Sequence, residues 1–215
     1  SNNTDDFGYG WRMEFRDTDL RTSLGKDEQY ETFGIRSKGF KEGTRVYITL
    51  PGGKREAFTF KPTVNRLSGY LGYAGSQGGV SGVDTNLYNP AFTADAGVTS
   101  TLSVRNPESS GNMLSRNLDT GIFSNLGGQL YNPGDAYFGG TYILTTKEGI
   151  EYEIDGTTGD LRKVTDTDGN TLTYTDADIT SSTGQKVTFE RDAQNRITSV
   201  IDPMGNKVTY AYDAK

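Results

Sequence analysis

The last third of the chain repeats itself, and this repeat constrains the fold more strongly than any other feature. Residues 161–174 align without a gap with residues 197–210, an offset of 36 residues (197 minus 161). A fixed period in this range is typical of architectures in which each unit buries its apolar face only against its neighbours. The structural positions that fall into register are Leu161, Val164, Asp166, Gly169, Asn170 and Tyr174 in the first unit and Ile197, Val200, Asp202, Gly205, Asn206 and Tyr210 in the second.

Each unit predicts a strand, a tight turn and a second strand. Asp166 and Gly169 supply the first turn, because glycine adopts positive φ and aspartate forms local hydrogen bonds to the backbone. Alternating apolar residues after each turn predict the second strand, which in the second unit runs to Tyr212. The apolar residues before each turn are three apart instead of two, a spacing that favours either a β-bulge or a strong twist in the strand of each unit.

The second unit closely resembles a known repeat. It contains Asp-Pro-Met-Gly-Asn at 202–206 and ends in a Tyr-Asp pair, Tyr212 and Asp213, also predicted to be structural. This pattern resembles the YD repeat of Rhs proteins, of the C components of Tc insecticidal toxins and of teneurins. The resemblance covers residues 149–215, and the upstream unit departs from it because its turn lacks the proline.

The composition predicts an all-β fold with few or no helices. The chain has 28 glycines, and its 13 tyrosines and 10 phenylalanines provide large apolar surface in few residues. The resemblance implies antiparallel hairpins that lead into a YD-repeat β-sheet spiral. We expect an N-terminal β-hairpin region at 1–65, a Gly/Tyr-rich β and loop region at 66–145, and the repeat region at 146–215.

Local patterns predict further elements upstream of the repeat. Alternating apolar residues on both sides of a Pro-Gly-Gly turn predict a β-hairpin over residues 45–60. Residues 30–37, 98–104 and 137–146 each favour a strand, and apolar residues in 114–126 favour a short helical turn.

The absent residue types exclude several kinds of chemistry. The chain has no cysteine and no histidine, which removes disulfides, His-dependent triads and the usual zinc ligand sets. A net charge of −6 argues against nucleic acid as a partner, because phosphates require a basic footprint. The sequence indicates neither a cofactor nor a membrane span.

Carboxylates are the only catalytic side chains present in quantity. Glu151, Glu153 and Asp155 are spaced by two on the polar face of one expected strand. Like charges at this spacing can raise one pKa and form an acid/base pair. A solvated strand face that discourages edge pairing is the favoured interpretation, and we expect no enzymatic activity.

A calcium site is a weak alternative at the first repeat turn. Asp166, Asp168 and Asn170 place oxygen ligands near a glycine. The glycine comes two positions too early for an EF-hand loop, and residue 175 is threonine instead of the required glutamate. A plain turn without metal is therefore favoured.

Aromatic side chains in irregular segments are the candidates for ligand binding. Sugars stack on exposed aromatic rings while neighbouring polar groups bind the hydroxyls. The competing interpretation is that these tyrosines are part of the core. The candidates are Trp11, Tyr70, Tyr73, Tyr88 and Tyr131.

These observations favour a structural function. The resemblance implies a β-scaffold segment of a large, bacterial, secreted or surface protein, related to toxins, whose repeats form a shell or stalk around another domain. Its partners would be further repeats and a C-terminal domain of the same parent chain. The alternative is a carbohydrate-binding or cell-surface adhesion module that binds a glycan or a protein. If Tyr210 belongs to the core, its replacement by alanine costs about 3–5 kcal/mol.

Overall fold

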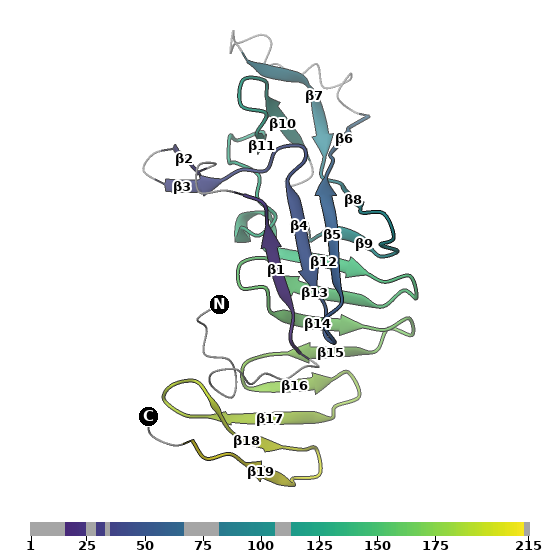
Figure 1. Cartoon of the computed structure of the whole chain (residues 1–215), viewed down its shortest axis with the longest axis vertical. Helices are drawn as coiled ribbons and strands as arrows, with labels where there is room; N and C mark the ends of the chain where they lie inside the picture. The colour runs from purple at the N-terminus through teal and green to yellow at the C-terminus, as the bar shows by residue number, and fades with distance from the viewer. Residues whose placement is uncertain (1–15, 25–28, 33–34, 67–81, 106–112, 213–215) are drawn as a thin grey trace.

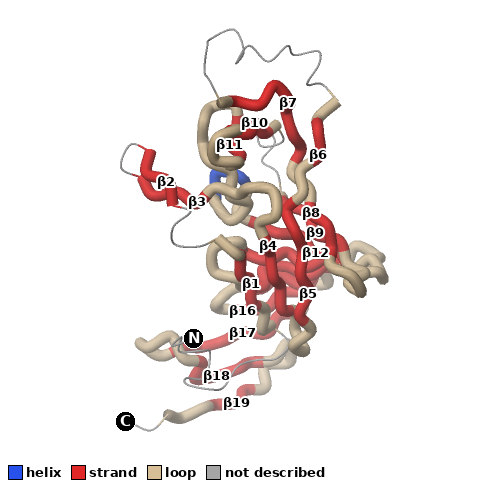
Figure 2. Tube along the Cα trace, turned by 45° about the horizontal axis from the view of Figure 1, so that its top comes forward, coloured by secondary structure: helices blue, strands red, loops and turns tan. Residues whose placement is uncertain are grey.

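The computed structural model describes residues 16–24, 29–32, 35–66, 82–105 and 113–212 (Figure 1). Strands make up 48% of the structure, and all pairings between them are antiparallel. The one helical element in the described ranges is a short 3-10 helix, η3 (Ala136–Phe138), drawn in blue in Figure 2. The all-β prediction is confirmed.

The repeat builds one nine-stranded antiparallel sheet, the repeat sheet. Its strands follow one another in space in nearly the order of the sequence, because tight turns join each pair from β12 onward (Figure 1). The strands are β9 (Thr101–Val104), β12 (Thr141–Thr145), β13 (Glu151–Asp155), β14 (Leu161–Thr165), β15 (Thr171–Tyr174), β16 (Asp178–Ser181), β17 (Lys186–Arg191), β18 (Ile197–Ile201) and β19 (Lys207–Thr209).

Of the two alternatives that the spacing favours, a β-bulge is present in both units. In β14, Lys163 pairs with Glu153 and Leu161 with Ile154, so Arg162 is the extra residue. In β18, the extra residue is Thr198, 36 positions later, where the register shifts between Glu190 and Arg191 of β17. The bulge brings apolar residues that are three apart onto the same face of the sheet.

One face of the repeat sheet, the inner face, is apolar. Strand alternation gives each strand one or two large side chains on this face. Its buried members are Leu102, Val104, Tyr142, Leu144, Ile154, Leu161, Tyr174, Ile179, Phe189 and Ile197.

A second sheet, the cover sheet, lies across part of the inner face. It has the order β1-β4-β5-β8, and Figure 1 shows β1, β4 and β5 running across the strands of the repeat sheet. The predicted hairpin over residues 45–60 is confirmed as its centre. The strands are β1 (Asp19–Thr22), β4 (Arg45–Thr49), β5 (Arg55–Phe60) and β8 (Phe92–Ala94).

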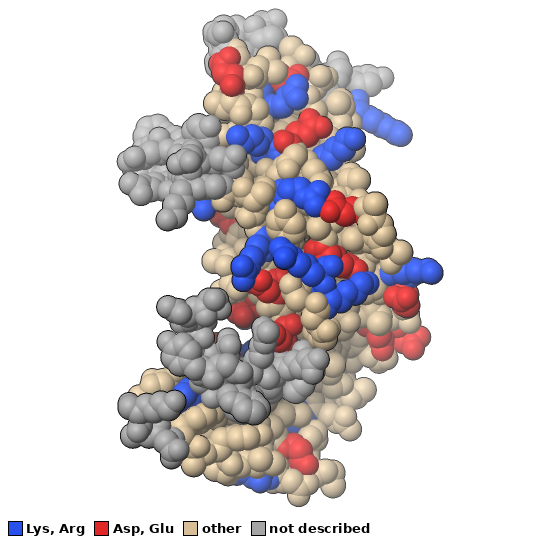
Figure 3. Space-filling view, in the orientation of Figure 1, with Lys and Arg blue, Asp and Glu red and all other residues tan. Residues whose placement is uncertain are grey.

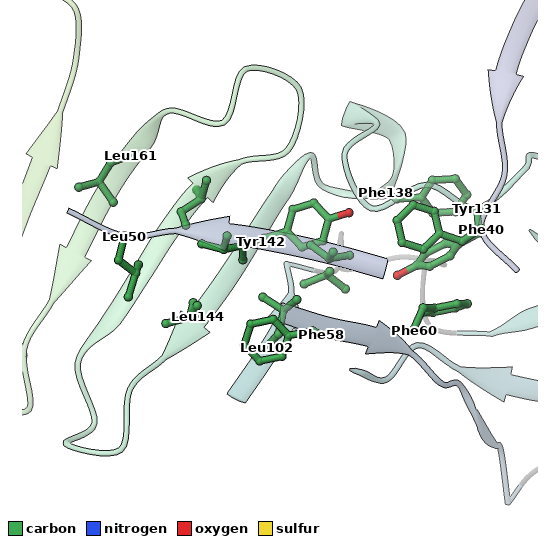
Figure 4. Close-up of a cluster of buried hydrophobic side chains, with 14 of the residues drawn as sticks. Phe40, Leu50, Phe58, Phe60, Leu102, Tyr131, Phe138, Tyr142, Leu144 and Leu161 are labelled. Carbon is green, nitrogen blue, oxygen red and sulfur yellow. The ribbon is translucent and has the colours of Figure 1, made fainter. Parts of the chain in front are cut away.

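The core is formed where the two sheets cross. Figure 4 shows Leu50 and Phe58 of the β4–β5 hairpin beside Tyr142 and Leu144 of the repeat sheet. Phe58, Tyr142 and Leu144 are fully buried. Burying an aromatic ring removes 150–250 Å² of surface from water, so this crossing fixes the cover sheet on the repeat sheet.

The outer face of the cover sheet is polar. The guanidinium groups of Arg45 and Arg55 lie 5.6 and 4.7 Å from the ring centroid of Tyr47. Asp95 accepts hydrogen bonds from two nitrogens of Arg45. Figure 3 shows Lys and Arg interspersed with Asp and Glu where β1, β4 and β5 lie, as expected for a solvated face.

Two smaller sheets complete the described fold. An aromatic cluster joins the first of them to the cover sheet, with Phe60 and Phe123 ring centroids 5.5 Å apart. This sheet has the order β11-β10-β7-β6, from β6 (Thr63–Val64), β7 (Val83–Asn89), β10 (Leu114–Asn117) and β11 (Phe123–Asn125). The second is a hairpin of β2 (Gln29–Thr32) and β3 (Ile35–Lys38).

Several local predictions were wrong in detail. Within the expected strand over 30–37, residues 30–32 and 35–37 belong to the two separate strands of a hairpin. Residues 114–126 form a β-hairpin instead of a helical turn, because Asn117 accepts hydrogen bonds from Asp119 and Thr120 that close a tight turn. The strand expected over 137–146 begins only at Thr141, after η3.

The strand expected over 98–104 is shorter, because β9 begins at Thr101. The division of the chain at residues 65 and 145 stays a prediction. The repeat sheet itself includes β9 and β12, which precede residue 146.

Candidate functional site: the repeat turns and the edge strand

The two predicted repeat turns have the same hydrogen-bond network. Asp166 Oδ1 accepts from the backbone amides of Asp168 and Asn170 at 2.9 and 2.8 Å, and Oδ2 accepts from Asn170 Nδ2 at 2.9 Å. Asp202 accepts from Met204 and Asn206 in the same way, at 2.9, 2.8 and 2.7 Å. The carboxylate therefore fixes each turn with three hydrogen bonds.

These hydrogen bonds change the acidity of both carboxyls. The side-chain amides of Asn170 and Asn206 are the largest cause that holds the pKa of Asp166 and Asp202 below the ordinary value of 3.8, and backbone amides add to it. Donors that bind the ionised form favour it over the neutral form. The turns are thus built for a charged aspartate.

A third turn of the same kind was missed from the sequence. Asp192 Oδ1 accepts from the amides of Gln194 and Arg196, and Oδ2 accepts from Arg196 Nε at 2.7 Å. Asn195 replaces glycine there, with φ of 65°. The sequence contains a signal for this turn. An aspartate is followed three residues later by Gly or Asn, and four residues later by a side chain that donates a hydrogen bond.

The calcium candidates belong to the first of these turns. Both carboxylate oxygens of Asp166 accept hydrogen bonds from Asp168 and Asn170 within the turn. These hydrogen bonds stabilise the turn without a metal ion. Within the described residues, no group of three or more acidic side chains is arranged to hold a metal ion.

Two of the three carboxylates of β13, those of Glu153 and Asp155, lie beside basic side chains, whereas Glu151 is exposed. Glu153 lies 3.6 Å from Lys163 Nζ and accepts from Arg105, and Asp155 lies 3.0 Å from Arg162. Burial alone would raise the pKa of Asp155, but the amides of Thr158 and its neighbour and the guanidinium of Arg162 lower it. A general acid needs the opposite shift.

Two of the candidate binding tyrosines lie in the interior. Tyr131 is 1% exposed, and its ring stacks on Phe60 with centroids 5.5 Å apart. Burial raises the pKa of its hydroxyl well above the ordinary value. Tyr88 lies in β7, not in an irregular segment, and is 8% exposed. The other three, Trp11, Tyr70 and Tyr73, lie outside the described residues.

Tyr88 is held by the partly buried ion pair of Asp84 and Arg116. Its hydroxyl donates to Asp84 Oδ2 at 2.7 Å, and Arg116 Nη2 donates to the same oxygen at 2.7 Å. The guanidinium of Arg116 also lies 5.6 Å from the centroid of the Tyr88 ring. The hydroxyl of Tyr88 is therefore engaged in a hydrogen bond within the protein.

Tyr210 does not belong to the buried core of the described chain. Tyr174, its counterpart in the first unit, is 7% exposed, whereas Tyr210 is 38% exposed. The difference follows from position, because β15 lies between β14 and β16, whereas β19 pairs with β18 alone in the described part of the chain. Strand β19 also ends at Thr209, before Tyr212.

Tyr212 packs back on its own unit. Its hydroxyl donates to the carbonyl of Ile197 at 2.5 Å, and the guanidinium of Arg196 lies 4.2 Å from its ring centroid. Asp213, the second residue of the Tyr-Asp pair, lies outside the described residues.

The family model of the RHS repeat matches residues 191–215, which contain the Asp192 turn, β18 and β19. The chain carries an RHS repeat. The match supports the assignment to the YD/Rhs-repeat family that the sequence predicted. The upstream unit lies outside the matched residues, although its turn and bulge have the same geometry as those of the RHS repeat.

A comparison with curated proteins finds no match. No helix in the described part of the chain has the length and apolar character of a membrane span.

Proposed function

We propose that this chain is a structural segment of a large YD-repeat protein, in which successive repeats extend one β-sheet into a shell or stalk around another domain. The observation that supports it is the way the RHS repeat joins the fold. Its strands add in order to a sheet that already contains the upstream unit, so each repeat is stabilised by its neighbours.

The proposed mechanism is burial and exclusion, not catalysis. Apolar side chains of the repeats cover the inner face. Acidic side chains either fix turns or form ion pairs with basic side chains on neighbouring strands, as Asp178 does with Lys186 at 2.6 Å. In these roles the carboxylates of Asp166, Asp178 and Asp202 are engaged in structural contacts. An extracellular or surface location and a bacterial source fit the RHS repeat and belong to the proposal.

Protease protection tests the shell. The natural parent protein is digested with and without Ile154→Asp, which places a charge at a fully buried position of the inner face. We expect the domain downstream of the repeats to resist digestion in the parent and to be cut rapidly in the variant. Glu151→Ala, at an exposed position of the same strand, is the control. Equal digestion in all three proteins contradicts a shell.

A glycan panel tests the alternative of a recognition module. We expect no reproducible binding by this chain, with or without calcium, because Tyr88 and Tyr131 are used in the core. Binding that disappears on replacing Trp11, Tyr70 or Tyr73 in folded variants overturns the scaffold proposal.

A further inference from the structure

Two tyrosine hydroxyls in the interior have no hydrogen-bond partner among the residues that the structure describes. They belong to Tyr131, which is 1% exposed, and to Tyr142, which is 0% exposed. The large majority of buried polar side-chain atoms in folded proteins hydrogen-bond to the protein or to an ordered water. Two such hydroxyls in one region of the core therefore require an explanation.

The two hydroxyls come from different parts of the fold and face each other. Tyr142 lies in β12 of the repeat sheet, whereas Tyr131 lies between β11 and η3. Figure 4 shows the hydroxyl of Tyr142 directed toward the aromatic cluster and the hydroxyl of Tyr131 directed toward Tyr142. After burial, Tyr142 is the next cause that raises the pKa of Tyr131, so the two groups interact electrostatically.

The ring of Tyr131 is fixed by its neighbours. It stacks on Phe60 with centroids 5.5 Å apart, and the centroid of Phe138 lies 5.0 Å away in a T-shaped contact. Its backbone is fixed as well, because its carbonyl accepts from Phe40 N at 2.7 Å and its amide donates to Phe123 O at 2.8 Å. The hydroxyl therefore cannot turn toward another partner without repacking the cluster.

The ring of Tyr142 is fixed by glycine backbone. A Cβ added at Gly156 would lie 3.1 Å from Tyr142 Cε2 and 2.5 Å from Gly134 Cα. On another side, the ring centroid of Phe92 lies 6.2 Å away. This close packing holds the Tyr142 hydroxyl in the direction of Tyr131.

Water is the ligand that suits two neutral hydroxyls in apolar surroundings. Burial raises the pKa of both groups, so both remain O–H groups that can donate and accept. A water can accept from one hydroxyl and donate to the other, and buried waters typically bind two to four polar groups that otherwise lack partners. An ion among these aromatic rings would lose its hydration without a compensating charge.

We infer that the hydroxyls of Tyr131 and Tyr142 form a binding site for one buried water, which bridges them and joins the repeat sheet to the aromatic cluster. The two hydroxyls do not bond to each other directly. The inference is independent of the proposed function, because it concerns the junction between sheets within this chain.

A crystal structure of the whole chain tests the site directly. We expect electron density for one water oxygen at an O–H···O distance, about 2.7–2.8 Å, from both hydroxyl oxygens. Absence of this density overturns the inference. A direct contact between the two hydroxyls, or an ion in place of the water, also overturns it.

Urea denaturation of Tyr131→Phe, Tyr142→Phe and the double variant tests the bridge in solution. We expect each single variant to lower the folding equilibrium constant about fivefold, because one hydroxyl and the water lose a hydrogen bond. The double variant should show no further loss, because the first substitution already breaks the bridge.

Tyr88→Phe combined with Tyr131→Phe is the control for additivity. The hydroxyl of Tyr88 donates to Asp84 instead, so the two losses should add. Higher stability in Y131F or Y142F would show that the hydroxyl has no partner, and additive losses in their double variant would show separate partners. Either result overturns the inference, and the crystal structure decides the question even if a variant does not fold.

Discussion

At the scale of residues, the repeat turns depend on one backbone conformation that glycine adopts most easily. Gly169 has φ of 83° with no atom within 4 Å of an added Cβ, so substitution there meets strain but no clash. We expect Gly169→Ala to lower the free energy of unfolding by about 1–2 kcal/mol. Gly169→Asn should cost less, because Asn195 adopts positive φ in the Asp192 turn. Chemical denaturation measures both, and equal losses would contradict the argument.

The carboxylates of the turns make stability depend on pH. The folded state lowers the pKa of Asp202 below 3.8, so its stabilising effect is complete above that pH and is lost as pH falls through the folded pKa. We expect the melting temperature to drop less between pH 6 and pH 3 in Asp202→Asn than in the parent chain. Asp168→Asn is the control, and parallel curves for D202N and the parent would argue against this role.

The two repeat tyrosines, Tyr174 and Tyr210, differ in burial, so their replacement should lower the free energy of unfolding by different amounts. Tyr174→Ala removes a buried ring and should lower the free energy of unfolding by about 3–5 kcal/mol. Tyr210→Ala, at a position that is 38% exposed, should cost clearly less. Urea titration of both variants measures the two free energies of unfolding. A larger decrease in Y210A than in Y174A would contradict this prediction.

At the scale of elements, the equivalent strands β15 and β19 differ in their neighbours. Thr173 directs its amide toward β16, whereas Thr209 directs its amide away from β18. Thr173→Pro should therefore cost about 3 kcal/mol or more, and Thr209→Pro about 1 kcal/mol or less. Thermal melts of the two variants test the difference, and similar losses would show that the edge of β19 is occupied.

At the scale of the whole molecule, the cover sheet stabilises only part of the repeat sheet. Strands β12 and β13 carry fully buried residues beneath it, such as Leu144 and Ile154. In β19, by contrast, Val208 is 56% exposed. Native-state hydrogen exchange should show protection that falls from β12 toward β19, because repeat units open locally at their ends. Uniform protection would indicate a single cooperative unit.

The sequence by itself determined the features that depend on neighbouring residues. Period, turn chemistry and alternation are local, so Asp166 with Gly169, the bulges and the β4–β5 hairpin were predictable. The tertiary structure decided which residues are buried. Tyr174 and Tyr210 have the same place in the repeat, but Tyr174 pairs with Ile179 of β16, whereas β19 pairs with β18 alone in the described part of the chain. Tyr131 is likewise in the core because the aromatic cluster closes around it.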